Sequence, residues 1–182
     1  MINKVDLEVG KLYYGFPVFL LGYKDEKYGY NFTTNSSSYT LGDMIVIGTG
    51  KQNAFKQIEF YKSFTVNLPT SDLMKEIEIG GFNSGADKFA LSELTYSLSD
   101  KVDAPIIDRC SLTIECELAN IVVFGSYVNM IGKIVGRKIE QELQADGNLI
   151  REKLQPVIYV GDDKMRSYRY LSQEVKDLGD FI

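Results

Sequence analysis

Short apolar runs, and runs in which apolar and polar residues alternate, dominate the chain and predict a protein built mainly from β-strands. The clearest alternation covers residues 112–123, and a strand at 128–139 is expected to pair with it across the turn at 125–126. Turns rich in glycine or polar residues separate the runs. Further strands are expected at residues 16–22, 30–37, 44–49, 64–68 and 157–160.

Segments whose residue pattern is typical of a helix interrupt the predicted strands in three places. Apolar residues recur at helical intervals between residues 53 and 62, with Asn53 as the expected N-cap. A second helix is expected to begin at Ser71 and to run to residue 79, where the glycine-rich turn 80–85 follows. A helical turn is expected at 87–91. Short strands with inserted helices, and no regular βαβ alternation, favour an antiparallel β-barrel with helical insertions.

The chain contains no histidine, which removes several classes of chemistry at once. A Ser-His-Asp triad, a Cys-His dyad and a zinc site with a histidine ligand are all excluded. The 20 basic and 25 acidic residues leave a net charge of −5, so the electrostatic footprint of a nucleic-acid-binding protein is missing. Chemistry must therefore come from carboxylates, lysines, hydroxyls, backbone amides or a bound cofactor.

The two cysteines and the first residues of the chain bear on its compartment. Cys116 lies in the alternating run on the same face as its apolar neighbours, which predicts a buried, reduced thiol on a strand. Cys110 and Cys116 are badly spaced for a metal site. No apolar run approaches the roughly 20 residues of a membrane span, and acids stand where a signal peptide would be apolar. We therefore expect a cytoplasmic protein that does not contact a membrane.

The sequence GTGK at residues 48–51 is the first candidate for ligand binding. It differs from a nucleotide-binding P-loop, because the first glycine of that motif would fall at Ile45 and its serine or threonine at Gln52. What remains is a set of flexible amides, Lys51 and the start of a helix, a combination that suits an anionic group. The alternative is a surface turn with a solvated lysine.

A strand rich in hydroxyl and amide side chains, NFTTNSSS at residues 31–38, is the second candidate. Buried hydroxyls and amides need hydrogen-bond partners, so one face of this strand is expected to bind a polar ligand. An exposed edge strand rich in serine and threonine is the alternative. The turn at 80–85 is a weaker candidate, because it lacks the G-x-G-x-x-G fingerprint and a surrounding βαβ unit, and the alternative is that Gly80 and Gly81 simply end a helix.

Several segments, taken in order, carry a resemblance to a known family. They are PVFLL at 17–21, NFTTNSS at 31–37, IVIG at 45–48 with Lys51 following, FTVNLP at 64–69, SGADKF at 84–89, APII at 104–107, ECEL at 115–118 and PVIYVG at 156–161. Their order and spacing together resemble the flavin reductase-like family of the FMN-binding split barrel, and within it the flavoredoxin type. The resemblance implies a six- or seven-stranded antiparallel Greek-key barrel, and a homodimer with FMN at or near the protomer interface.

The resemblance also implies which residues bind the cofactor. The strand at 31–37 would line the flavin and its ribityl phosphate, 48–50 would run beside the ring, Lys51 and Asn53 would meet the phosphate, and 84–89 would close on the cofactor. The expected cofactor-binding residues are Asn31, Thr33, Asn35, Ser36, Ser37, Gly48, Thr49, Gly50, Lys51, Asn53, Ser84, Gly85, Lys88 and Phe89. No metal and no catalytic side chain is expected, since the flavin N5 carries the chemistry.

Two departures from the family pattern bear on function. The chain has no tryptophan, although many members carry one shortly after the Asn-x-x-Thr strand. Members that oxidise pyridine nucleotides often carry Gly-Asp-His where this chain has Gly125, Ser126 and Tyr127. Tyr127 is therefore a possible modulator of the flavin, or an ordinary residue of the barrel rim.

Three functional hypotheses remain open on the sequence. The first is an FMN-dependent oxidoreductase that takes electrons from NAD(P)H or from a redox protein. The second is an electron carrier whose protein partner does the catalysis, and the third is a barrel that binds another ligand or only a protein partner. Residues 1–161 are expected to form the split-barrel domain, and residues 162–182 a C-terminal tail that packs on the barrel or on a dimer partner.

Overall fold

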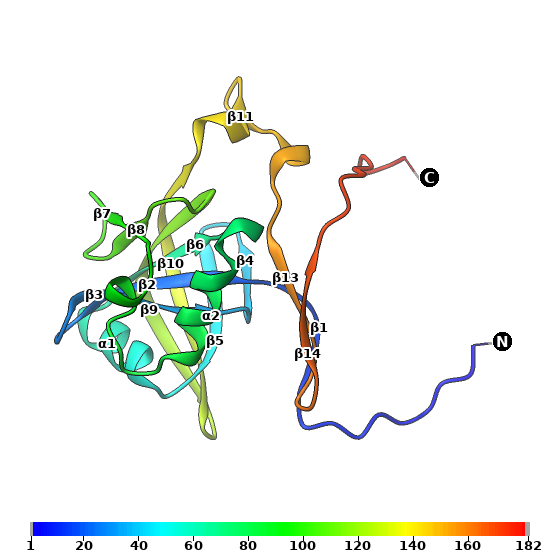
Figure 1. Cartoon of the computed structure of the whole chain (residues 1–182), viewed down its shortest axis with the longest axis horizontal. Coiled ribbons are helices and arrows are strands. Elements are labelled where there is room, and N and C mark those ends of the chain that lie inside the picture. Colours follow the sequence, from blue (N-terminus) through cyan, green and yellow to red (C-terminus); the bar gives the residue numbers. More distant parts are fainter. Residues whose placement is uncertain (1, 181–182) are drawn as a thin grey trace.

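The computed structural model describes residues 2–180, so Met1 and the last two residues of the predicted tail lie outside the described residues. It is a mainly β protein in which helices cover one side of a curled sheet (Figure 1). The strands are β1 (Leu12–Pro17), β2 (Phe19–Asp25), β3 (Gly29–Asn35), β4 (Ser38–Leu41), β5 (Met44–Gly50), β6 (Ser63–Leu68), β7 (Tyr96–Leu98), β8 (Pro105–Ile107), β9 (Leu112–Phe124), β10 (Tyr127–Ile139), β11 (Gln144–Ala145), β12 (Asn148–Leu149), β13 (Val157–Asp162) and β14 (Arg166–Tyr170). The helices are α1 (Asn53–Tyr61), α2 (Met74–Phe82) and α3 (Lys88–Leu91), with 3-10 turns at Ser71–Leu73, Gln141–Leu143 and Arg151–Lys153.

Seven strands form one antiparallel sheet in the order β3-β2-β6-β9-β10-β5-β4. Its two ends meet where β3 leads into β4, because the Asn35 side chain donates to the Gly48 carbonyl of β5 at 3.0 Å and the Gly48 amide donates to the Ser37 carbonyl at 2.8 Å. The sheet therefore closes at one corner by a few hydrogen bonds rather than by continuous pairing of two strands. The predicted antiparallel β-barrel with helical insertions is confirmed.

The strand β2 is buried on both faces, which explains the near-continuous apolar run at its position. Phe19 and Leu21 point into the barrel with Phe64 and Met130, while Leu20 points outward to a second cluster that includes Phe32 of β3. Leu73 and Ile77 of the α2 region cover that second cluster. The predicted strand at 16–22 is in fact divided, since β1 ends at Pro17 and β2 begins at Phe19.

Helix boundaries differ from the sequence expectation by a residue or more. The N-cap of α1 is Gln52, and Asn53 is instead the first helical residue, whose side chain donates to Asp25 Oδ2 at 3.1 Å. The 3-10 turn before α2 is capped by Thr70 rather than Ser71. The strand expected at 30–37 ends at Asn35, because its side-chain oxygen accepts the Ser36 and Ser37 amides and turns the chain.

Helix α2 extends through the glycines that the sequence placed in a turn. Gly80 lies so close to β3 that a Cβ there would meet Phe32 Cε2 at 2.9 Å, whereas a Cβ on Gly81 would meet Thr34 Cβ only at 3.8 Å. Thr34 Oγ1 also donates to the Ile77 carbonyl at 2.6 Å. Gly80 therefore serves the close packing of a helix on a strand, not a turn.

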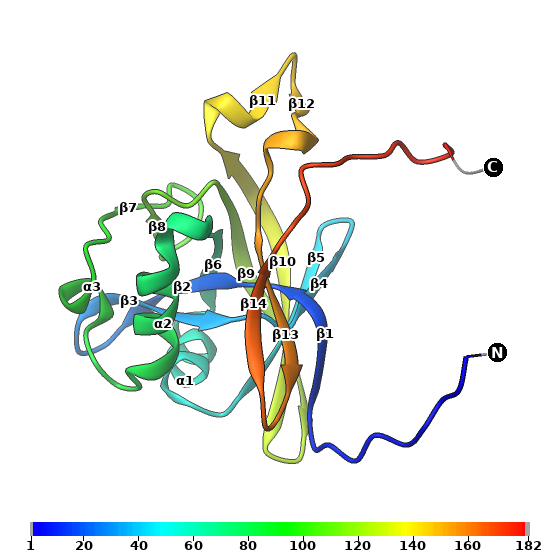
Figure 2. The same ribbon diagram turned by 45° about the vertical axis from the view of Figure 1, so that its right-hand side comes forward.

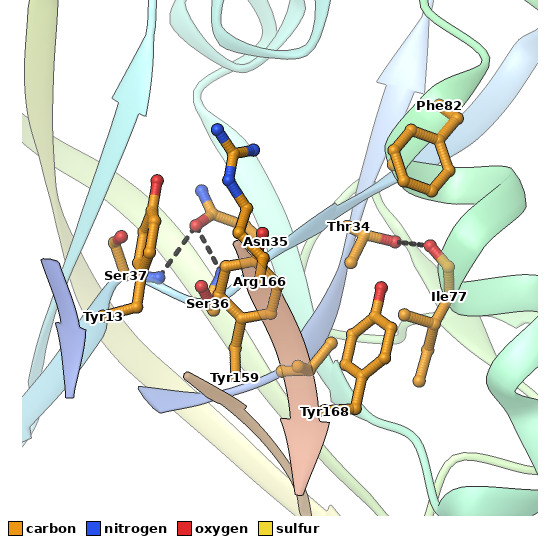
Figure 3. Close-up of a pocket in the computed structure, with 12 residues that line it drawn as sticks. Tyr13, Thr34, Asn35, Ser36, Ser37, Ile77, Phe82, Tyr159, Arg166 and Tyr168 are labelled. Atoms are coloured by element: carbon orange, nitrogen blue, oxygen red, sulfur yellow. Dashed lines mark hydrogen bonds between the residues drawn. The ribbon is translucent and has the colours of Figure 1, made fainter. Parts of the chain in front are cut away.

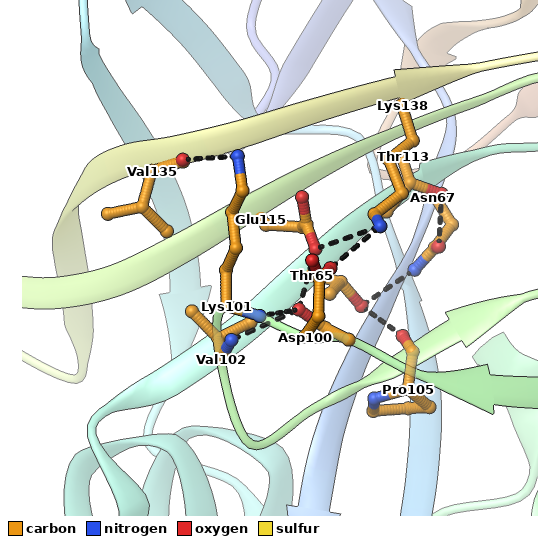
Figure 4. Close-up of polar contacts among 11 residues, drawn as sticks. Thr65, Asn67, Asp100, Lys101, Val102, Pro105, Thr113, Glu115, Val135 and Lys138 are labelled. Carbon is orange, nitrogen blue, oxygen red and sulfur yellow. Dashed lines mark hydrogen bonds and ion pairs between the residues drawn. The ribbon is translucent and has the colours of Figure 1, made fainter.

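The outer side of the first part of β9, at Thr113 and Glu115, is buried as well, beneath the segment that carries β7 and β8. Glu115 is fully buried, and its Oε1 accepts a hydrogen bond from Ser99 Oγ at 2.6 Å while Lys138 Nζ lies 3.9 Å away (Figure 4). Asn67 Oδ1 accepts from Thr113 Oγ1 at 2.8 Å and from the Ile107 amide at 3.1 Å. These polar bonds fasten the 99–107 segment to the sheet.

A separate three-stranded sheet, β1-β13-β14, stands beside the barrel (Figure 2). The strand β14 falls in the segment where the sequence signals were weak, and it pairs with β13 from Tyr170 to Arg166. Tyr159 and Tyr168 pack against the second core cluster, so this sheet is joined to the barrel through side chains.

Both cysteines are free and buried, and the prediction of a buried reduced thiol at Cys116 is confirmed. Burial raises the pKa of each thiol to about 12, which keeps both protonated near neutral pH. Among the described residues, no helix combines the length and the apolar character needed to cross a membrane.

Candidate functional site

Three hollows meet at Asn35, where the two ends of the large sheet come together. The basic cleft, of about 70 Å³, includes Thr33, Thr49, Asn53, Ser84, Gly85 and Lys88. The strand groove, of about 500 Å³, includes Lys11, Ser37, Gly48, Thr49, Gly50 and Tyr127. The tyrosine cavity, of about 240 Å³, includes Tyr13, Ser36, Phe82, Tyr159, Arg166 and Tyr168. Since Asn35 lines all three, the hollows lie next to one another.

Lys88 gives the basic cleft its character. Its side chain is only 4% exposed, and within residues 2–180 its ammonium has neither a hydrogen-bond acceptor nor an ion-pair partner. Burial lowers the pKa of Lys88, and the negative charge of Asp25 opposes that shift. A largely buried lysine whose ammonium has no acceptor is costly, and an anion in the cleft would supply one.

Asn31 holds Lys88 in position rather than facing the cleft. It is 1% exposed, and its side chain donates to the Ala86 carbonyl at 2.9 Å and accepts from the Lys88 amide at 3.2 Å. Asp87 begins α3 by accepting the Ala90 amide at 3.1 Å. The 84–88 loop is thus fixed against β3, so the lysine side chain starts from a rigid backbone.

The start of α1 forms the opposite wall of the basic cleft. Gln52 and Asn53 line it, together with Thr49 from the end of β5. Lys51 is exposed and lines none of the three hollows. Free amides at the first turn of a helix attract anions, so the helix start and Lys88 favour the same charge from two sides.

The strand groove runs along the end of β5 and the hairpin of β9 and β10. Gly48 and Gly50 pair with Asn129 and Tyr127 of β10, and the absence of side chains at the two glycines opens the groove. Tyr127 is 51% exposed, and Lys11 Nζ lies 5.7 Å from its ring centroid. A flat ligand could lie against the backbone of β5 here.

The structure gathers most of the predicted residues around Asn35. Thr33, Asn35, Asn53, Ser84, Gly85 and Lys88 line the basic cleft, Ser37, Gly48, Thr49 and Gly50 line the strand groove, and Ser36 lines the tyrosine cavity. Asn31, Lys51 and Phe89 do not line these hollows. Phe89 instead packs edge-on against Phe32, with the ring centroids 5.0 Å apart.

Sequence reasoning missed the wall formed by the three-stranded sheet. Tyr13, Tyr159, Arg166 and Tyr168 come from β1, β13 and β14, and they face Asn35, Ser36 and Ser37 across the tyrosine cavity (Figure 3). The alternation of Arg166 and Tyr168 along a short strand was the available signal. Pairing of distant strands was needed to bring those residues to the site.

Comparisons with known proteins agree with this geometry. The family model described as the flavin reductase like domain matches residues 13–167. Flavoredoxin of Desulfovibrio vulgaris (Miyazaki F) superposes with a TM-score of 0.87 at 24% identity, covering 98% of each chain. The FMN-binding protein of Thermus thermophilus superposes with a TM-score of 0.77 at 16% identity, covering 98% of this chain and 99% of that one.

Two relatives in sequence extend the comparison. The uncharacterized protein YdfE of Bacillus subtilis is 29% identical over 185 residues, 90% of this chain and 87% of that protein. The match to an uncharacterized protein of Pyrococcus abyssi spans 50% of this chain and about half, 54%, of that protein. Because the family model covers most of the chain, the chain belongs to the flavin reductase-like family. The family and split-barrel fold expected from the sequence are confirmed.

Proposed function

We propose that this protein is an FMN-binding flavoprotein that transfers electrons or hydride through the bound flavin. The observation that carries the proposal is Lys88, a lysine only 4% exposed that lines a cleft sharing Asn35 with two larger hollows. The cleft is polar and has a helix start on one wall, which fits a phosphate. The names of similar proteins, flavoredoxin and FMN-binding protein, support the same ligand.

Each part of the site would meet a different part of FMN. Lys88, Ser84 and the start of α1 would hold the phosphate, while Thr33 and Asn35 would hold the ribityl chain. The backbone at Gly48, Thr49 and Gly50 would lie beside the ring. FMN itself supplies the redox chemistry when bound, and these residues bind it, orient it and neutralise its charge.

We further propose that two copies associate through the outer face of the β9–β10 hairpin. Val122, Phe124 and Tyr127 share that face and are 48%, 80% and 51% exposed. Tyr39 and Leu41 of β4 continue it, since their strand pairs with β5 and so with β10. Exposed apolar side chains gathered on one face are typical of a protein interface. Tyr127 would then place the flavin groove next to the partner.

The electron donor separates two candidate functions. An enzyme would accept electrons from NADH or NADPH, while a carrier would accept them from a redox protein. The position of Tyr127 at the groove favours the carrier, because its ring would occupy space beside the flavin that a nicotinamide would need. A phenol is also in general a weaker proton donor at pH 7 than an imidazolium.

A flavin titration tests the proposal. Purified protein freed of ligand is titrated with FMN, riboflavin and AMP, and binding is followed by quenching of flavin fluorescence and by calorimetry. FMN is expected to bind more tightly than riboflavin, and AMP much more weakly than either. A protein that binds neither flavin would refute the proposed function. Equal affinities for FMN and riboflavin would show that the site does not recognise the phosphate.

A further inference from the structure

The tyrosine cavity adjoins the proposed flavin site but is built from different elements. Tyr13, Tyr159, Arg166 and Tyr168 of the three-stranded sheet form one wall, and Ser36 with Phe82 belongs to the facing wall on the barrel side (Figure 3). At about 240 Å³ the cavity is smaller than the roughly 300–1,000 Å³ of typical ligand pockets. It suits a ligand of about one aromatic ring.

The aromatic wall offers ring contacts to such a ligand. The rings of Tyr13 and Tyr159 meet edge-on with centroids 4.9 Å apart, and those of Tyr159 and Tyr168 lie 5.8 Å apart. Aromatic pairs favour these tilted and edge-on arrangements. An added ring would extend a stack that already exists.

Arg166 supplies a positive charge at the same cavity. Its guanidinium lies 5.9 Å from the centroid of the Tyr13 ring, and its Nε donates to the Asp162 carbonyl at 3.3 Å. Among residues 2–180 no carboxylate forms an ion pair with it. Arginine presents a planar fork that matches a carboxylate with two parallel hydrogen bonds. The cavity therefore combines an aromatic wall with an exposed guanidinium that forms no ion pair with a carboxylate among the described residues.

Shared residues connect this cavity with the flavin site. Asn35 and Ser37 also line the strand groove, and Thr34 and Gly81 also line the basic cleft. A ligand in the tyrosine cavity would lie beside the flavin that we place along Asn35. We propose that the tyrosine cavity binds a small aromatic carboxylate next to the flavin, with Arg166 holding the carboxylate, and this step rests on the proposed function.

Benzoate tests the inference, with benzamide as its uncharged counterpart. Each is titrated into FMN-loaded protein and followed by the change in the flavin absorbance spectrum, and into flavin-free protein by calorimetry. Arg166→Met is compared with Arg169→Met, which removes the same charge from the opposite face of β14. Loss of a hydrogen-bonded charge pair is expected to weaken benzoate about 10–100-fold in Arg166→Met. Arg169→Met should bind benzoate as the unaltered protein does. Benzamide should bind more weakly than benzoate in the proteins that keep Arg166, and about as weakly as benzoate in Arg166→Met.

The outcomes separate this inference from the proposed function. If FMN binds but benzoate does not, or if both arginine variants lose benzoate equally, the inference is overturned while the flavin assignment stands. If Arg166→Met loses FMN as strongly as benzoate, the cavity holds the flavin itself and the inference is again overturned. If no flavin binds but calorimetry shows benzoate binding that depends on Arg166, the proposed function fails and the carboxylate site is supported.

Discussion

Asn31 Oδ1 accepts a hydrogen bond from the Lys88 amide at 3.2 Å, although 57 positions separate the two residues in the sequence. That bond, with the one from Asn31 Nδ2 to the Ala86 carbonyl, attaches the 84–88 loop to β3. The loop cannot move without breaking buried hydrogen bonds, whose loss leaves unsatisfied groups. The lysine that faces the basic cleft is therefore preorganised, which lowers the cost of binding an anion.

Lys88→Met should weaken FMN about 10–100-fold and leave riboflavin nearly unchanged, because riboflavin lacks the phosphate that the ammonium would bind. Lys51→Met is the matched control, since Lys51 is an exposed lysine near the same helix. It should change FMN affinity much less. Fluorescence titration measures the affinity of each variant for FMN and for riboflavin. A larger effect at Lys51 than at Lys88 would return the phosphate contact to the residue first expected from the sequence.

The pH dependence of FMN binding should report the lowered pKa of Lys88. Burial places that pKa below its ordinary value of 10.5, so the free protein loses the ammonium at a lower pH than an exposed lysine would. The ratio of FMN to riboflavin affinity should therefore fall as pH rises from 7 toward 10.5. In Lys88→Met the ratio should stay flat over the same interval. A flat ratio in the unaltered protein would contradict the role of Lys88.

As pH rises, the stability of the flavin-free protein should increase, whereas the ratio of FMN to riboflavin affinity should fall. Because the folded state disfavours the charge of Lys88, the charged lysine lowers the free energy of unfolding at every pH below its folded pKa. This destabilisation disappears as pH rises from the lowered folded pKa to the ordinary value of 10.5. Flavin-free Lys88→Met should thus melt at a higher temperature than the unaltered protein at pH 7, with the gap closing at alkaline pH. Thermal unfolding followed by circular dichroism measures it.

Gly80→Ala and Gly81→Ala should have opposite effects on stability. A Cβ at residue 80 would meet Phe32 Cε2 at 2.9 Å, and such overpacking costs about 1–3 kcal/mol, partly offset by the roughly 1 kcal/mol that alanine gains over glycine in a helix. At Gly81 the nearest atom is 3.8 Å away, so only the helix gain remains. The free energy of unfolding, measured with denaturant, should be higher for Gly81→Ala than for the unaltered protein and lower for Gly80→Ala. Equal effects would show that α2 does not pack closely on β3 at Gly80.

Phe124→Asp should weaken self-association about tenfold or more, because it places a charge in the proposed apolar interface. Phe60→Asp is the control, since Phe60 is 75% exposed but lies on α1. Sedimentation of the FMN-loaded proteins measures the dissociation constant, and removal of FMN should weaken association further if the flavin lies at the interface. A monomeric FMN-loaded protein at all concentrations would end the homodimer proposal.

Much of the fold was predictable because local patterns carried it. The alternation in 112–123 and the turn at Gly125 sufficed for the long hairpin of β9 and β10. Gly80 was misplaced in a turn, because its close approach to Phe32 is a tertiary contact that composition does not reveal. The family resemblance brought Lys88 into the candidate set, but only packing distinguishes its buried ammonium from the exposed Lys51. Arg166 was missed because its strand joins the site through pairing with β13.

The three-stranded sheet also sets the order in which the protein can become complete during translation. Its first strand, β1, precedes the barrel, while β13 and β14 follow it, and the Gly10 amide bonds to Asp163 Oδ2 across 153 positions. A ribosome adding about 5–20 residues per second exposes the end of β10 roughly 1–5 seconds before β13, the strand that pairs with β1, has emerged. Throughout that interval β1 has no strand to pair with, and its exposed edge is open to other chains. Chaperone contact with the nascent chain is thus expected to concentrate on β1 and to end when β13 is released.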